Sequence, residues 1–197
     1  MTDRSRGYDE LADDFARIRD RRIGAAEVRA WASSLHAGAA VLDVACGTGE
    51  PITHALVDAG CRVWAIDASP RMVALCAARF PGMPIRCDAV EASDYFERTF
   101  DGIVAWGVMF LIPGPTQLEV IDRLARALVP GGRLLFTAPP MELQWNDAMT
   151  GLPSLSLGRD RYRQALADAG LTLTAEFEDA GGNHYYDAVR RAARRST

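Results

Sequence analysis

Hydrophobic positions follow two alternating spacings along most of the chain. Short, mostly apolar runs predict buried strands, at 39–45, 62–66, 84–87, 100–106 and 133–138. Between these runs, apolar side chains three or four positions apart predict helices, as in Leu118, Ile121, Leu124 and Leu128. Two further strands are expected at 171–177 and 184–189. Strands that alternate with helices predict an α/β fold, in which a mostly parallel sheet is covered by helices on both faces.

The pattern differs at two other places. Helical spacing predicts two helices before the first strand, with Leu11, Phe15 and Ile18 on one and Val28, Trp31 and Leu35 on the next. Residues 139–158 show neither spacing, so we expect a loop there. Its apolar side chains, Trp145 among them, suit the cover of an apolar substrate.

Composition is that of one globular domain spanning residues 1–197. Apolar residues make up 49% and charged residues 24% of the chain, and the net charge is −4. This acidic balance disfavours a broad nucleic-acid surface. All 22 basic residues are Arg, which excludes chemistry that needs a lysine.

The reactive side chains are too dispersed for a structural metal or disulfide framework. The four Cys include no C-x-x-C pair, and the three His lie far apart, so no metal site is expected. No apolar run reaches the length of a membrane span, and the N-terminus lacks an apolar signal core. We therefore expect a cytoplasmic protein with no membrane partner.

A glycine-rich turn follows the first strand, in Asp43-Val-Ala-Cys-Gly-Thr-Gly49. Gly47 and Gly49 lack Cβ atoms, so the backbone can turn sharply and a ligand can lie directly on it. The helix that begins just after offers free N–H groups and a partial positive charge. Asp43 either holds this loop or reaches the ligand through water.

Acidic residues end the next two strands as well. Asp67 is placed to accept both hydroxyls of a ribose, and Asp88 to accept from an exocyclic amine of a base. Met72, on the intervening helix, can pack on the face of the base. Because parallel strands end at one edge of a sheet, these groups predict a nucleoside site there.

With these motifs, the chain resembles class I S-adenosylmethionine-dependent methyltransferases of the small-molecule type. The glycine-rich turn, Asp67, Cys87-Asp88-Ala89, Phe100-Asp-Gly-Ile-Val104 and Leu128-Val-Pro-Gly-Gly-Arg-Leu-Leu135 match the family's motifs in order. The resemblance implies a Rossmann-like three-layer sandwich with a seven-stranded sheet, in the order 3-2-1-4-5-7-6 with strand 7 antiparallel. It also implies that S-adenosylmethionine is the cofactor and S-adenosylhomocysteine the product.

The resemblance assigns roles residue by residue. Gly47 and Gly49 face the methionine part of the cofactor, and the carbonyls of Ala45 and Trp106 accept from its ammonium. Asp67 binds the ribose. The adenine site is completed by Ala68, Met72, Asp88 and the N–H of Ala89. Residues 1–36 resemble the family's helical lid, in which we expect Tyr8 to close over the substrate and Phe15 to pack in the core.

The acceptor side departs from the family pattern. Gly107 and Leu111 stand where close relatives often carry an acid and a histidine, so the wall beside the methyl group is expected to be apolar. Met109, Phe110, Trp145 and Tyr8 are the candidate substrate contacts. The apolar wall favours a small apolar or aromatic acceptor, or one that is already nucleophilic at neutral pH, such as a thiolate or an amine. The candidate base is His184.

Other functions compete with methyl transfer. The same missing polar groups leave open a non-catalytic protein that binds S-adenosylmethionine. A nicotinamide dehydrogenase is disfavoured, because residues 47–52 lack the third glycine of G-x-G-x-x-G. The sequence is compatible with a monomer or a homodimer.

Overall fold

The computed structural model describes residues 4–191. Its main sheet has seven strands in the order β3-β2-β1-β4-β5-β9-β8. Only β9 runs antiparallel to its neighbours β5 and β8. The predicted order and the antiparallel seventh strand are therefore confirmed. The strands are β1 (Ala40–Val44), β2 (Arg62–Asp67), β3 (Ile85–Cys87), β4 (Phe100–Ala105), β5 (Leu128–Thr137), β8 (Leu171–Glu178) and β9 (His184–Arg190).

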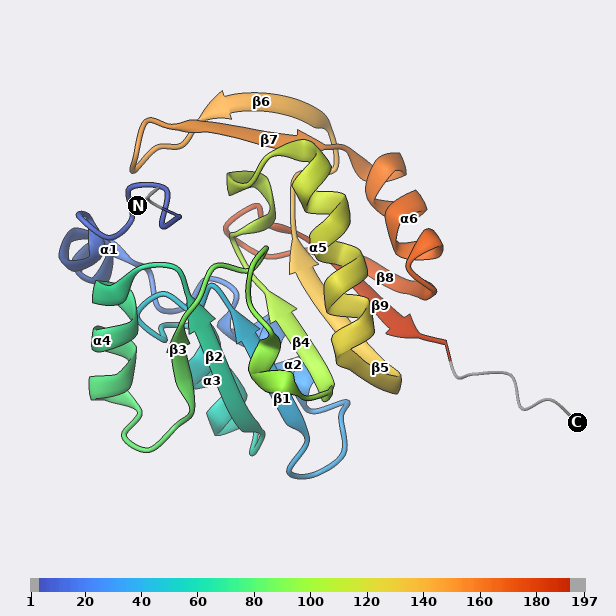
Figure 1. Cartoon of the computed structure of the whole chain (residues 1–197), viewed down its shortest axis with the longest axis horizontal. Helices are drawn as coiled ribbons and strands as arrows, with labels where there is room; N and C mark the ends of the chain where they lie inside the picture. The colour runs from blue at the N-terminus through green and yellow to red at the C-terminus, as the bar shows by residue number, and fades with distance from the viewer. Residues whose placement is uncertain (1–3, 192–197) are drawn as a thin grey trace, which may run out of the picture.

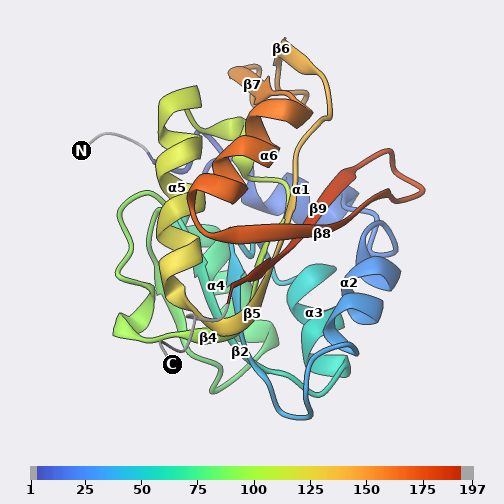
Figure 2. The same cartoon turned by 90° about the vertical axis from the view of Figure 1, so that its right-hand side faces the viewer.

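Helices cover both faces of this sheet, as predicted. They are α1 (Ala12–Ile18), α2 (Ala25–Ala32), α3 (Ile52–Asp58), α4 (Pro70–Arg79), α5 (Gly114–Ala127) and α6 (Arg159–Asp168), with 3-10 turns η1 (Tyr95–Glu97) and η2 (Met109–Leu111). In Figure 2, α5 and α6 lie on one side of the strands and α2 and α3 on the other. No helix within residues 4–191 is long and apolar enough to cross a bilayer.

Alternating side chains of the central strands supply two cores. Leu42 of β1 and Ile103 of β4 pack with α5 and α6, whereas their neighbours Val41 and Val104 pack with α2 and α3. All five residues of β1 are buried, which explains why four of them are apolar and only Asp43 is charged. The central strands are thus packed between helices on both faces, and this packing fixes the positions of the residues at the strand ends.

The expected loop at 139–158 is wrong, because most of this segment forms a β-hairpin. Strands β6 (Glu142–Asn146) and β7 (Pro153–Leu157) pair antiparallel as a separate sheet. The two fully enclosed side chains of β7 are Ser154 and Ser156, and β6 is largely exposed. Polar residues at the buried positions hide the strand pattern that apolar ones would have given.

The hairpin and the N-terminal segment lie side by side at the same end of the molecule (Figure 1). The Tyr8 hydroxyl donates to Oδ2 of Asp147 at 3.1 Å, and Nη2 of Arg6 donates to the carbonyl of Pro153 at 2.8 Å. Two segments far apart in sequence therefore meet across the carboxyl ends of the central strands.

Candidate functional site

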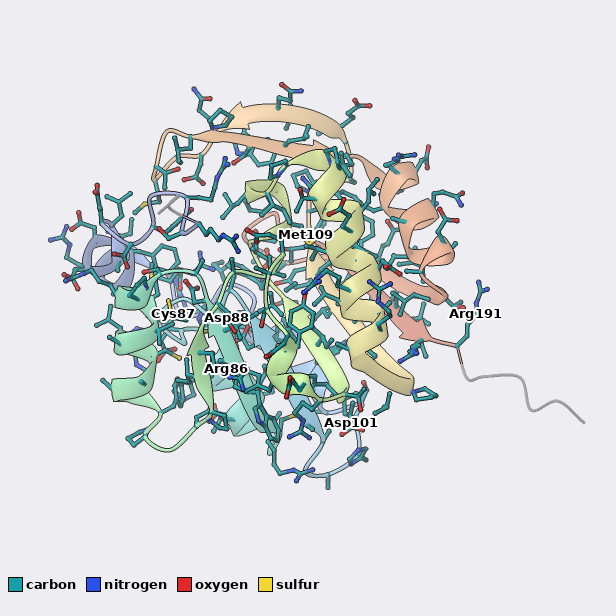
Figure 3. The ribbon with its side chains drawn as sticks, viewed as in Figure 1. Arg86, Cys87, Asp88, Asp101, Met109 and Arg191 are labelled. Atoms are coloured by element: carbon teal, nitrogen blue, oxygen red, sulfur yellow. The ribbon has the colours of Figure 1, made fainter. Side chains whose placement is uncertain are left out.

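A cavity of about 300 Å³ lies where four neighbouring strands end. Ala45 follows β1, Asp67 ends β2, Asp88 follows β3 and Trp106 follows β4, and all four residues line it. Figure 3 labels Asp88 on this side of the sheet and Asp101 at the opposite end. All the predicted cofactor residues except Asp43 and Gly49 line the cavity.

The glycine-rich turn owes its shape to left-handed backbone. Gly47 has φ +56° and Gly49 has φ +83°, and Ala45 adopts φ +57° although it carries a Cβ atom. Gly47 borders the cavity, and a Cβ there would lie 3.7 Å from the ring of Phe15. Gly49 instead packs beneath the turn, where an added Cβ would come within 2.5 Å of the Phe80 ring. Its role in the structure is therefore close packing against α4.

Asp67 joins the turn to the second strand. Its Oδ2 accepts the N–H of Gly47 and its Oδ1 accepts the N–H of Ser69, each at 2.8 Å. Burial raises the pKa of Asp67, and these two N–H groups act in the opposite direction. The carboxyl group is thus held in one orientation at the edge of the cavity.

Asp43 lies under the turn and away from the cavity surface. It is 1% exposed, and its Oδ2 accepts the Thr53 hydroxyl at 2.5 Å. Burial raises the pKa of Asp43 to about 7. Because Thr53 belongs to α3, this contact connects the first strand to the helix behind the turn. Of the two roles left open by the sequence, the contact favours holding the loop.

The far end of the cavity has the polarity of a nucleoside-base site. Ala68 and Met72 contribute apolar surface beside Asp67, and Met72 is almost fully buried. Ser93 donates its hydroxyl to Oδ2 of Asp88 at 3.1 Å, which orients that carboxylate. Ala89 continues the wall next to it. An apolar slot with one acceptor at its rim suits a flat ring that carries an amine.

On the acceptor side, the structure separates the four predicted contacts. Tyr8 and Phe110 line the cavity. Met109 is fully buried in η2, among the residues that pack against α5, and is not in the lining. Trp145 of β6 lies outside the lining too, with its ring 5.4 Å from that of Phe110. Trp145 therefore backs a cavity residue from the hairpin side.

His184 does not face the cavity. Its Nε2 lies 3.2 Å from Oε1 of Glu176 and its Nδ1 lies 3.4 Å from Oε1 of Glu178, both on β8. Side chains alternate along a strand, so His184 shares the face of Tyr186, whose ring it contacts. The neighbouring Asn183 lines the cavity instead. The geometry gives His184 no access to an acceptor in this conformation.

The cavity also contains residues that are not among the site residues predicted from the sequence. Phe15, expected in the core, is only half-buried and lies edge-on to Tyr8 with ring centroids 5.9 Å apart. Arg19 packs on Trp106, and Arg4 and Arg6 come from the N-terminal segment. The only sequence signal for these arginines is their place in the segment that resembles a lid.

Comparison with known proteins agrees with this geometry. The family described as "Methyltransferase domain" matches residues 41–132, the span from β1 to the middle of β5. The ubiquinone biosynthesis O-methyltransferase of Xanthomonas oryzae pv. oryzae is 29% identical over 163 residues, which cover 79% of this chain and 59% of that protein. Residues 41–132 of the chain are thus similar to a methyltransferase domain.

The methyltransferases that the chain resembles differ in the acceptor that their names give. The cypemycin N-terminal methyltransferase of a Streptomyces species is 30% identical over 161 residues, which cover 78% of this chain and 65% of that protein. The chain thus spans about six tenths of the length of these two relatives. Magnesium protoporphyrin IX methyltransferase from Synechocystis PCC 6803, solved with bound S-adenosylmethionine, superposes with a TM-score of 0.70 at 19% identity. That match covers 91% of this chain and 84% of the other, and it supports the fold.

Proposed function

We propose that this protein transfers the methyl group of S-adenosylmethionine to a small molecule. The observation that carries the proposal is the convergence of Gly47, Asp67 and Asp88 on one cavity. The glycine backbone after β1 suits the methionine part of the cofactor. The fixed carboxylate at the end of β2 suits its ribose, and the second carboxylate, after β3, suits its adenine. The match of residues 41–132 to a methyltransferase domain supports the same cofactor.

The residues present fit this cofactor. Asp67 would hold the ribose hydroxyls, with Ala68 and Met72 against the adenine and Asp88 at its amine edge. When bound, the cofactor would supply a methyl group carried by a sulfonium. The leaving group would be a neutral sulfide, so no acid is needed to protonate it. The protein's contribution is alignment and exclusion of water, which supply roughly 7–11 kcal/mol in favourable cases.

The acceptor wall suits an apolar or aromatic body. Val108, Phe110 and Leu111 line the cavity. The N–H of Gly107 donates a hydrogen bond to Oγ1 of Thr137 at 2.8 Å, so it is already paired within the protein. Tyr8 closes the opposite side. Burial and Asp147 both raise the pKa of Tyr8, so its hydroxyl stays protonated at neutral pH. We therefore assign Tyr8 a closing role, and infer an acceptor that is nucleophilic without a base from this wall.

Residues 1–36 and the hairpin of residues 139–158 are proposed to be the lid and the substrate cover. Their contact through Tyr8 and Asp147 supports this assignment, because it spans the mouth of the cavity. A reducing compartment such as the cytoplasm suits the chain, since the buried thiols of Cys46 and Cys76 are free.

Calorimetry tests the proposal directly. S-adenosylmethionine and S-adenosylhomocysteine should each bind with one-to-one stoichiometry. Release of S-adenosylhomocysteine in the presence of thiols, amines, phenols or carboxylates then identifies the acceptor class. A protein that binds neither nucleoside would remove the proposed function.

A further inference from the structure

Arg19 is a cavity residue that has no role among those expected from the sequence. It directly follows α1, and its side chain lines the cavity. The guanidinium carbon lies 4.0 Å from the centre of the Trp106 ring and 5.4 Å from that of Phe15. These two aromatic contacts fix the plane of the guanidinium at the cavity wall.

One edge of this guanidinium has no partner among the residues that the structure describes. Nε and Nη2 of Arg19 are buried, and neither makes a hydrogen bond with any residue from 4 to 191. A buried donor without a partner destabilises the fold, and a charged donor does so more strongly. Nε and Nη2 are the pair of donors that bind both oxygens of a carboxylate side by side. The unpartnered atoms therefore form a ready receptor for a planar anion.

Nearby charges do not occupy this edge. Burial lowers the pKa of Arg19, while Tyr8, Tyr185, Asp179 and Asp20 act in the opposite direction. Asp179 is the acid of the adjacent β8–β9 connection. Its Oδ2 accepts from the Tyr185 hydroxyl and the Asn183 amide, both at 2.8 Å, and its Oδ1 accepts the N–H of Gly181 at 2.9 Å. Asp20 binds the guanidinium of Arg22. Each neighbouring acid is thus already engaged.

The strand order places Arg19 at the β4 end of the cavity, away from the groups proposed for the ribose and the adenine. The ribose and adenine groups belong to β2 and β3, whereas Trp106 follows β4 and its Nε1 donates to the Tyr185 hydroxyl of β9 at 2.7 Å. Arg19 lies over this Trp106 ring, on the far side of β1 from Asp67. Arg6 adds to the positive charge of the same cavity, and its Nε is also buried without a partner in the described chain.

We propose that Arg19 binds a carboxylate of the methyl acceptor, through Nε and Nη2. The inference rests on the proposed function and names its substrate class: a small acid whose apolar or aromatic body lies against Phe110. The buried fork selects the anion, and the apolar wall selects the body. The proposed class of acceptor is thus narrower than the one expected from the sequence, because it must carry a carboxylate as well as an apolar or aromatic body.

A matched pair of ligands tests the proposal. Naphthalene-2-carboxylate and its neutral carboxamide have nearly the same shape, and their binding is measured by calorimetry with and without saturating S-adenosylhomocysteine. The proteins are the wild type, Arg19→Gln, Arg19→Lys and the control Arg17→Gln. Arg17 lies on α1 but is exposed and paired with Asp14. Melting temperatures verify that each variant is folded.

We expect the wild type to bind the carboxylate at least tenfold more tightly than the amide. Arg19→Gln should abolish this preference, Arg19→Lys should recover only part of it because a lysine lacks the fork, and Arg17→Gln should keep it. The affinity for S-adenosylhomocysteine should change less than threefold in all variants.

Two results would overturn the assignment. Equal or absent binding of carboxylate and amide by the wild type would mean that the cavity has no anion receptor. A tenfold loss of S-adenosylhomocysteine affinity in Arg19→Gln, with carboxylate binding unchanged, would assign the guanidinium to the cofactor's own carboxylate. Failure of the proposed function is distinct: the wild type would then not bind S-adenosylhomocysteine, while the carboxylate preference measured without it would still report on Arg19.

Discussion

At the scale of single residues, Asp67 combines two tasks in one carboxyl group. It holds the glycine-rich turn through Gly47 and lines the cavity where a ribose would lie. A side chain that is already oriented loses little freedom on binding, so its contacts with a ligand contribute fully to affinity. The same double role means that its removal disturbs both the turn and the ligand.

We predict that Asp67→Ala weakens S-adenosylmethionine binding by about 1.5–3 kcal/mol, because charge-assisted bonds to the ribose are lost. Calorimetry measures the change. Asp122→Asn provides the control, since Asp122 is an exposed partner of Arg126 on α5. Unchanged affinity in Asp67→Ala would remove this residue from the site.

His184→Ala should retain turnover within a few fold, because the imidazole contacts Glu176 rather than the cavity. Its melting temperature should fall, since a buried side chain is truncated. Steady-state rates per folded molecule separate the two effects. Loss of turnover with intact cofactor binding would instead make His184 a catalytic residue.

At the scale of elements, the turn after β1 is shaped by what lies beneath it. Gly49 and Gly82 share nearly the same left-handed φ, +83° and +84°. An added Cβ at Gly49 meets the Phe80 ring at 2.5 Å and Cys76 Sγ at 3.0 Å, whereas one at Gly82 meets nothing within 4 Å. The two positions therefore separate backbone strain from packing.

Gly49→Ala should destabilise the fold more than Gly82→Ala, by roughly 1–3 kcal/mol from overpacking against α4. Urea unfolding of both variants and the wild type gives the difference. Equal destabilisation of the two would show that Phe80 moves aside freely and that the left-handed backbone alone requires glycine at 49.

The same scale explains which parts of the site the sequence could predict. Strands whose inward residues are apolar, such as β1, are visible as runs, and acids that end them are placed by the parallel topology alone. The hairpin was missed because Ser154 and Ser156 occupy its buried positions. The direction of His184 depends on the register of β9 with β8, and the contact of Arg19 with Trp106 depends on how α1 docks. Neither leaves a local pattern.

At the scale of the whole molecule, Asp43 is buried between the centre of the sheet and the helix α3, beneath the glycine-rich turn. The strand that carries Asp43 is buried along its full length. The Asp43 carboxyl group accepts the hydroxyl of Thr53, a residue of the covering helix α3. The charged form of this carboxyl group is disfavoured throughout the folded state. In the unfolded chain it returns to water and to an ordinary pKa near 3.8.

This difference makes global stability depend on pH in a defined direction. Between about pH 4 and 7 the folded state keeps the Asp43 proton while the unfolded state releases it, so the stability contributed by this group falls as pH rises and levels off above 7. Asp43→Asn removes the titration but keeps an acceptor for Thr53. From pH 5 to 8 the wild type should therefore lose roughly 2–3 kcal/mol more unfolding free energy than Asp43→Asn, measured by urea titration. Parallel curves for the two proteins would mean that Asp43 is already ionised in the fold, and that the buried pair with Thr53 accommodates a charge.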